Sequence, residues 1–96
     1  MQLDDIKKIA VIGAGNMGHQ IALNAAICGF KVICTDINPE TLAKAKRFVD
    51  DYLPGRVTKG RLTTEQAAFA RENIRFVGKL EDAVGDADYV IEAALE

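Results

Sequence analysis

The chain has 96 residues, of which 49% are hydrophobic and 27% charged, and its formal net charge is −2. This length suits one small domain or part of a larger one, and the interspersed charges argue against a nucleic-acid surface. The apolar stretch at residues 9–34 contains polar side chains and four glycines, which argues against a membrane span. Asp4 and Asp5 precede it and no small-x-small cleavage site follows, which argues against a signal peptide. We therefore expect a cytoplasmic protein without nucleic-acid or membrane partners.

The first third of the chain predicts a strand, a helix and a second strand. Residues 8–12 (KIAVI) are apolar at nearly every position, which suits a central parallel strand covered on both faces. A helix is predicted over residues 16–28 and should end at Gly29 in a left-handed conformation. Residues 31–35 (KVICT) form a second β-branched strand. The helix should bury the residues that recur at helical spacing: Met17, Ile21, Ala25 and Cys28.

The remainder of the chain predicts two helices before the third strand. Asn38, Pro39 and Glu40 mark a helix start, because Asn caps, Pro fits the first turn and Glu favours the positive end of the dipole. Pro54 and Gly55 should end this helix. The later elements are a helix over 64–72 with the capping box Thr63-x-x-Gln66, a strand at 74–77, a helical turn at 80–84 and a strand at 89–93.

The order of these elements predicts the fold class. Strands alternate with helices, and such alternation indicates a parallel sheet joined by right-handed crossovers. We expect an α/β, Rossmann-like, doubly wound sheet that is present only in part, with four strands in the order 3-2-1-4. Such a sheet contains the adenosine half of a dinucleotide fold and the first strand beyond its switch point.

A glycine-rich segment, VIGAGNMGHQIA at residues 11–22, has the spacing G-x-G-x-x-G between the first strand and the first helix. Gly13 allows a sharp turn, Gly15 has no side chain to keep a diphosphate away, and Gly18 allows close packing of the helix. Unpaired N–H groups at the helix start would point at the anion. The predicted cofactor-binding residues here are Gly13, Ala14, Gly15, Asn16, Met17 and Gly18.

An acid, Asp36, closes the second strand 18 residues after Gly18. A carboxylate at this position accepts hydrogen bonds from an adenosine ribose. It would repel a 2′-phosphate, and Thr35, Ile37 and Asn38 offer no arginine to offset its charge, so NAD is expected rather than NADP. The alternative is a glycine-rich turn with an unrelated loop aspartate. The cofactor hypothesis requires Asp36 to lie beside the loop and the loop amides to be free.

Other chemistry-bearing side chains are interpreted as structural. The one histidine, His19, follows Gly18 and should be a partly exposed helix residue, because it lies near the diphosphate and far from a reacting nicotinamide. Cys28 and Cys34 fit no zinc or redox spacing, so they are interpreted as core residues and no metal site is expected. Glu92 is either a cofactor-site residue or a buried, paired acid.

Four segments, VIGAGNMGHQIA, VICTDINPETLAKAK, KGRLT and ADYVIEAALE, together resemble the start of the NAD-binding domain of 3-hydroxyacyl-CoA dehydrogenases, including the 3-hydroxybutyryl-CoA type. The resemblance covers essentially the whole chain. Its more specific parts are the two-helix excursion over residues 39–73 and the closing DYVIEAALE. It implies NAD as cofactor and oxidation of an L-3-hydroxyacyl-CoA to the 3-ketoacyl-CoA in fatty-acid metabolism.

The resemblance also implies roles for single residues. The glycine loop would hold the pyrophosphate and Asp36 the ribose, while Glu96 matches the second acid of the family's E-A-x-x-E pattern beside the cofactor. Lys59 falls where the family places a lysine that can meet the CoA phosphates; its alternative is a solvated loop residue. The family's catalytic His–Glu pair lies beyond the position of Glu96. Residues 1–96 are therefore expected to hold no catalytic residue and to be the N-terminal part of a dinucleotide-binding domain, without its remainder or the C-terminal helical domain.

Two alternatives stay open: a fragment of another β-hydroxyacid dehydrogenase, and a non-catalytic NAD- or ADP-binding module. The long insert at residues 52–72 favours the CoA family over the first. The chain alone is expected to bind the ADP portion of NAD weakly and to transfer no hydride, with acyl-CoA binding only in a longer parent protein. Residues 89–93 would form an exposed, β-prone edge, through which we expect self-association.

Overall fold

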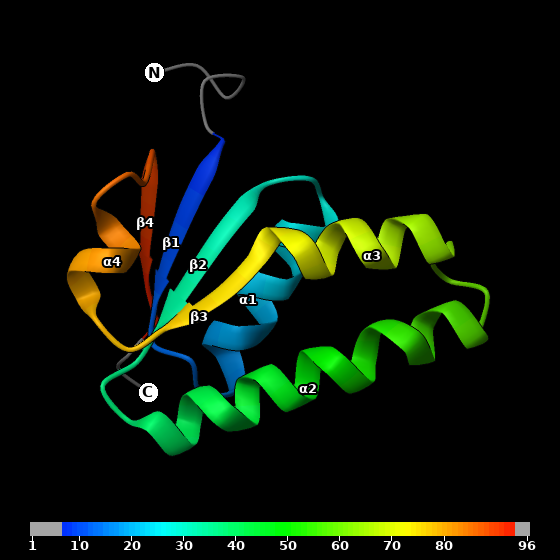
Figure 1. Ribbon diagram of the computed structural model, residues 1–96, viewed down its shortest axis with the longest axis horizontal. Helices are drawn as coiled ribbons and strands as arrows, with labels where there is room; N and C mark the ends of the chain where they lie inside the picture. Colours follow the sequence, from blue (N-terminus) through cyan, green and yellow to red (C-terminus); the bar gives the residue numbers. More distant parts are fainter. Residues whose placement is uncertain (1–6, 94–96) are drawn as a thin grey trace.

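The computed structural model describes residues 7–93, and its elements follow the predicted order (Figure 1). Within this range four parallel strands form one sheet in the order β3-β2-β1-β4, which confirms the predicted fold class. The elements are β1 (Lys8–Ile12), α1 (Asn16–Ile27), β2 (Lys31–Thr35), α2 (Pro39–Thr58), α3 (Thr64–Asn73), β3 (Ile74–Val77), α4 (Leu80–Val84) and β4 (Tyr89–Glu92).

The connections place helices on both faces of the sheet. The first two connections step in one direction across the sheet, whereas the α4 connection steps back past β2 and β1 to reach β4. Right-handed crossovers then place α1 and α4 on opposite faces, and α1 passes behind the strands in Figure 1. The main core lies on the α1 side, where Val11, Val32 and Cys34 cluster with Ala22 and Ala26.

The buried face of α1 differs from the predicted one. Met17 is 59% exposed and Cys28 is also exposed, so these two assignments to the core are wrong. Several adjacent apolar residues give this helix more than one apolar stripe, and periodicity alone could not choose between them. Gly18, Ala22 and Ala26 are small and recur every four residues, so this line of the helix can approach its neighbours closely. The buried residues are Gly18, His19, Ala22, Leu23 and Ala26.

Helix α2 runs past its predicted end. Pro54 and Gly55 lie inside the helix, which continues to Thr58. Pro54 has no N–H to donate to the carbonyl of Asp50, four residues earlier. Both residues are exposed, so this carbonyl can accept a hydrogen bond from water instead. The chain leaves the helix at Gly60, which has a φ of 73° and donates its N–H to the carbonyl of Val57 at 3.0 Å. The left-handed glycine, and not the proline, therefore ends the helix.

The starts of α2 and α3 confirm the predicted caps. The Asn38 side chain accepts a hydrogen bond from the backbone N–H of Glu40 at 2.9 Å. In the capping box, Gln66 N–H donates to Thr63 Oγ1 at 3.0 Å, and Thr63 N–H donates to Gln66 Oε1 at 2.9 Å. None of the helices found between residues 7 and 93 is both long and apolar enough to cross a membrane.

Candidate functional site

The loop between β1 and α1 turns at the carboxyl edge of the sheet. Gly13 has a φ of 105°, which favours glycine, and its N–H donates to the carbonyl of Thr35 at 2.7 Å. Gly18 packs directly against this turn: a Cβ there would lie 1.8 Å from the Gly13 carbonyl oxygen. At Gly15, by contrast, no atom lies within 4 Å of the position that a Cβ would occupy. The loop is therefore closed towards the helix and open at Gly15.

The first turn of α1 has no side-chain cap. Gly15 occupies the N-cap position and contributes no side-chain hydrogen bond, whereas Asn38 and Thr63 cap the other two long helices. Within the described part of the chain, the amides of Gly15, Met17 and Gly18 have no protein acceptor. This is expected, because the first N–H groups of a helix have no carbonyl partner inside the helix. Such amides, together with the helix dipole, favour an anion at this point.

Asp36 lies beside the loop, as the cofactor hypothesis requires. Its Oδ2 accepts the N–H of Ala14 at 2.9 Å, and its Oδ1 accepts the N–H of Asn38 at 2.9 Å. Each carboxylate oxygen keeps a further lone pair, which can accept from a hydroxyl group. The amides of Gly13 and Ala14 are thus already bonded inside the protein. The loop donors that remain for an anion begin at Gly15.

His19 is buried, with 8% of its surface exposed, so its prediction as a partly exposed residue is wrong. Its Nδ1 lies 3.3 Å from the carbonyl oxygen of Ala14, and its ring centroid is 4.6 Å from that of Phe48 on α2. The burial comes from α2, which brings Phe48 against the first turn of α1. The sequence around His19 carries no trace of this contact, because the two residues are far apart in the chain.

Two further predictions have different outcomes. Cys34 is buried as expected, and burial, with a smaller contribution from the charge of Asp36, raises the pKa of its thiol to about 12. A thiol with so high a pKa is a poor nucleophile at neutral pH. Glu92 is exposed on β4, which rules out the buried, paired acid. The next residue, Ala93, donates its N–H to the carbonyl of Ile12 at 2.7 Å, beside the glycine loop.

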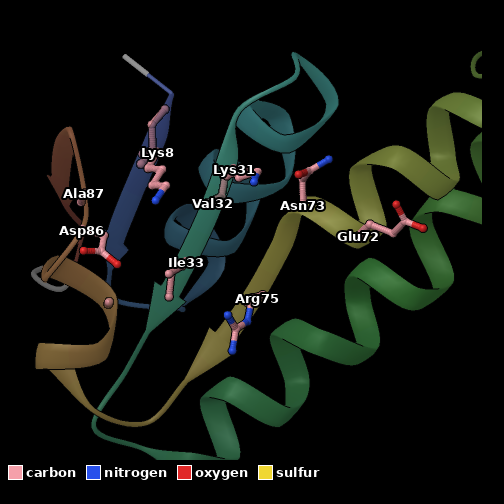
Figure 2. Close-up of a pocket in the computed structure, with 11 residues that line it drawn as sticks. Lys8, Lys31, Val32, Ile33, Glu72, Asn73, Arg75, Asp86 and Ala87 are labelled. Atoms are coloured by element: carbon pink, nitrogen blue, oxygen red, sulfur yellow. The ribbon is translucent and has the colours of Figure 1, made fainter. Parts of the chain in front are cut away.

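Two of the hollows in the structure lie at opposite ends of the strands. One, of about 420 Å³, lies at the amino ends of β1 and β2, where Figure 2 shows Lys8, Lys31, Arg75 and Asp86 around it. The other, of about 530 Å³, lies between the loop, α1 and α2. Ligands of open α/β sheets bind outside the carboxyl ends of the strands, so the second hollow adjoins the candidate site. Its lining includes Ala14, Gly15, His19, Thr41, Lys44 and Phe48.

Comparison with known proteins identifies the family. Residues 8–96 match the family model described as "3-hydroxyacyl-CoA dehydrogenase, NAD binding domain". The chain belongs to this family. It is 40% identical over 91 residues to 3-hydroxybutyryl-CoA dehydrogenase of Bradyrhizobium diazoefficiens, covering 95% of this chain and 31% of that protein. It is 38% identical over 92 residues to the fatty acid oxidation complex subunit alpha of Pseudomonas savastanoi pv. phaseolicola, covering 96% and 13%.

A solved structure supports the same relationship. The crystal structure of 3-hydroxybutyryl-CoA dehydrogenase from Escherichia coli matches with a TM-score of 0.88 and 40% identity, covering 95% of this chain and 19% of that one. The chain thus spans less than a third of the length of each of these relatives. The predicted family and its cofactor, NAD, are confirmed.

As a member of the 3-hydroxyacyl-CoA dehydrogenase NAD-binding family, the chain brings only some of the predicted residues together. The glycine loop and Asp36 meet at the carboxyl edge. Lys59 is exposed at the far end of α2, and a 20-residue helix is about 30 Å long, so Lys59 lies well away from the loop. Glu96 lies outside the described residues.

Sequence reasoning missed two residues at this edge. Ile37, which follows Asp36, is 98% exposed, so a large apolar side chain stands without protein contact beside the site. The available signal was an apolar residue between two polar ones in a loop. Phe48 packs on His19 and also stacks on Tyr52, with ring centroids 5.5 Å apart. The signal for Phe48 was its i, i+4 spacing to Tyr52 on a helix.

Proposed function

We propose that this chain binds the ADP half of NAD at the carboxyl edge of its sheet. The observation that carries the proposal is the Asp36 carboxylate 2.9 Å from the Ala14 amide, beside the uncapped first turn of α1. The diphosphate accepts hydrogen bonds from the amides of residues 15–18, and the adenosine ribose donates to Asp36. Because the Asp36 charge repels a 2′-phosphate, NAD binds better than NADP.

Ile37 adds an apolar contact to this site. It directly follows the ribose-binding acid and is almost fully exposed. An adenine ring placed against it would remove both apolar surfaces from water, at roughly 25 cal/mol per Å². Ile37 therefore contributes affinity for the adenine base, while Asp36 contributes selection of the ribose.

The parent protein is proposed to be an NAD-dependent dehydrogenase of fatty-acid metabolism that oxidises an L-3-hydroxyacyl-CoA to the 3-ketoacyl-CoA. The names of the relatives, 3-hydroxybutyryl-CoA dehydrogenase and fatty acid oxidation complex subunit alpha, support this substrate class. NAD supplies the hydride acceptor. The 96 residues form the N-terminal part of the cofactor domain, and their one histidine, His19, is bonded to a loop carbonyl and not to an acid. We therefore propose that this part binds and orients the cofactor, and that other residues of the parent move the proton.

Isothermal titration calorimetry of the folded chain tests the cofactor site. ADP and NAD should bind with similar affinity, because both present the same ADP group, and NADP should bind at least about tenfold more weakly. Asp36→Asn should weaken ADP binding and reduce the preference for NAD over NADP. Asp51→Asn, which removes the same charge from an exposed position of α2, is the matched control. Absence of any heat with ADP and NAD on folded protein would contradict the proposal.

A turnover assay tests the proposed division of labour. The chain with NAD and L-3-hydroxybutyryl-CoA should show no increase in NADH absorbance while it still binds ADP. Measurable turnover would mean that residues 1–96 contain a catalytic base. If the parent protein also bound ADP but did not turn over acyl-CoA, the alternative of a non-catalytic NAD- or ADP-binding module would be favoured.

Lys59 is proposed to contact the CoA phosphates, as the family resemblance implies, and Glu96 to lie beside the cofactor. Lys59 is exposed, and among the described residues it forms no ion pair with an acid. In the parent protein, Lys59→Ala should raise the KM for acyl-CoA and leave ADP binding unchanged. Lys46→Ala, at an exposed lysine inside α2, is the control. Equal effects of the two substitutions would argue for a general charge effect.

Self-association through β4 is also proposed. This strand pairs only with β1, so its outer edge is unpaired within the described sheet, and Tyr89 and Val90 are 52% and 45% exposed. Unprotected strand edges recruit other strands. Sedimentation should therefore show dimers or larger species, and Val90→Lys should shift the chain to monomer. A monodisperse wild-type monomer at high concentration would refute this. The cytoplasmic location stays a prediction from the sequence.

A further inference from the structure

His19 is a buried polar residue that the proposed function does not use. It lies on the inner side of the first turn of α1, between the glycine loop and Phe48 of α2. The ring makes one hydrogen bond in the described structure, between Nδ1 and the carbonyl oxygen of Ala14 at 3.3 Å. Because a carbonyl oxygen can only accept, the geometry assigns the proton to Nδ1.

The partner of this hydrogen bond is the peptide group that carries the first open amide of the site. The carbonyl of Ala14 and the N–H of Gly15 belong to the same planar unit, and in a trans peptide they point in opposite directions. Holding the Ala14 carbonyl against the buried His19 ring therefore directs the Gly15 N–H away from the protein interior. That N–H has no protein acceptor in the part of the chain that the structure describes.

The Ala14–Gly15 peptide needs such a restraint. Gly15 has no side chain, and nothing lies within 4 Å of the position that a Cβ would occupy, so no side-chain contact of this residue restricts its φ angle. The other side of Ala14 is already held, because its N–H donates to Asp36. The hydrogen bond to His19 is the second restraint on Ala14. It fixes the direction of the Ala14 carbonyl, whereas Asp36 fixes only the Ala14 N–H.

The position of the His19 ring depends in turn on α2. Phe48 packs on the ring at 4.6 Å with an interplanar angle of 55°, and Tyr52 stacks on Phe48 at 5.5 Å. The guanidinium carbon of Arg56 lies 5.3 Å from the Tyr52 ring centroid. Aromatic pairs at such distances are favourable beyond their buried area. This row of side chains holds the imidazole in place under the loop.

We infer that His19 is a positioning residue of the nucleotide site: by holding the Ala14 carbonyl, it presents the Gly15 amide to the diphosphate. The inference rests on the proposed function for its ligand, but its structural half, the restraint on the Ala14–Gly15 peptide, does not need the ligand. His19 touches neither the reacting atoms nor the diphosphate in this role.

Two substitutions separate the hydrogen bond from the ring. His19→Asn keeps a donor nitrogen at the same distance from the backbone as Nδ1 and loses the contact with Phe48. His19→Phe keeps an aromatic ring against Phe48 and loses the donor. Calorimetry with ADP should show binding about five- to tenfold weaker for His19→Phe and within about twofold of wild type for His19→Asn, from the usual strength of one hydrogen bond. Thermal stability should fall more in His19→Asn than in His19→Phe, because only His19→Asn loses the aromatic contact with Phe48.

The amide resonance of Gly15 supplies a readout without ligand. In His19→Phe it should broaden and exchange with solvent faster, and in His19→Asn it should stay as in wild type. His19→Ala, checked for folding by circular dichroism, replaces His19→Phe if that variant does not fold. If wild type does not bind ADP, the proposed function is wrong. The Gly15 resonance still tests whether His19 restrains the Ala14–Gly15 peptide, because that measurement needs no ligand. Equal ADP affinity of His19→Phe and wild type, equal loss in both variants, or an unchanged Gly15 resonance in His19→Phe would overturn the inference.

Discussion

Replacing Gly18 by alanine tests the close approach of α1 to the glycine loop. The new Cβ would lie 1.8 Å from the carbonyl oxygen of Gly13 and 2.7 Å from its carbonyl carbon. Both atoms belong to the backbone, so no change of rotamer relieves the contact. To reach a separation of 3.0 Å from the carbonyl oxygen, the helix and the loop must move apart by about 1.2 Å, whereas the third neighbour of the new Cβ, the Cβ of Ala93, lies at an ordinary contact distance of 3.6 Å.

The size of the effect follows from two opposing contributions. Forcing extra atoms into a packed interior costs roughly 1–3 kcal/mol and occasionally more. We take about 3 kcal/mol, the upper end of this range, because the clash is with backbone atoms that cannot change rotamer. Alanine is better than glycine inside a helix by about 1 kcal/mol. The free energy of unfolding should therefore fall by about 2 kcal/mol, which for a domain of this size lowers the melting temperature by about 8–16 °C.

Urea unfolding followed by circular dichroism measures this loss, with two matched glycine variants. Gly55→Ala, inside α2 and with nothing within 4 Å of its Cβ, should gain about 0.5–1 kcal/mol. Gly15→Ala should leave the free energy of unfolding within about 0.5 kcal/mol, because nothing lies within 4 Å of its Cβ position. It should weaken ADP binding more than tenfold, because its methyl group would enter the space proposed for the diphosphate. A Gly18→Ala chain as stable as wild type would refute the reasoning, since it would show that the helix and loop are not in contact.

Three further predictions concern side chains outside the loop. Iodoacetamide at pH 8 should label the exposed Cys28 and spare Cys34, because burial raises the pKa of the Cys34 thiol to about 12. Both cysteines should be labelled in urea, and labelling of Cys34 in the folded chain would contradict this prediction. Thr63→Ala should lower the free energy of unfolding by about 1 kcal/mol through loss of the capping box, measured by urea unfolding, and an unchanged midpoint would argue against that box. Hydrogen bonds from the backbone N–H groups of Lys7 and Lys8 lower the pKa of Asp88 below its usual 3.8. Its contribution to stability is therefore present above about pH 4 and is lost as the pH falls through the folded pKa; an NMR titration of Asp88 at its ordinary pKa would refute this.

Local sequence patterns predicted most of the fold. The strands were recognisable because buried parallel strands need continuous apolar runs, and the starts of α2 and α3 because Asn38 and Thr63 cap in ways that depend on residues two or three positions away. The ends of helices were harder. Pro54 should have ended α2, but an exposed position tolerates the lost hydrogen bond, and the helix ran on to the left-handed Gly60.

The sequence alone determined the fold class, the glycine loop and the acid that closes β2, because each depends on residue types at short, regular spacings. Only the tertiary structure decided which stripe of α1 is buried, which loop amides stay open and where the histidine ring lies. Those outcomes depend on contacts between distant residues: Asp36 with Ala14, and Phe48 with His19. No local pattern encodes such pairs, since they arise only once the sheet brings the ends of β1 and β2 together and α2 packs across the first turn of α1.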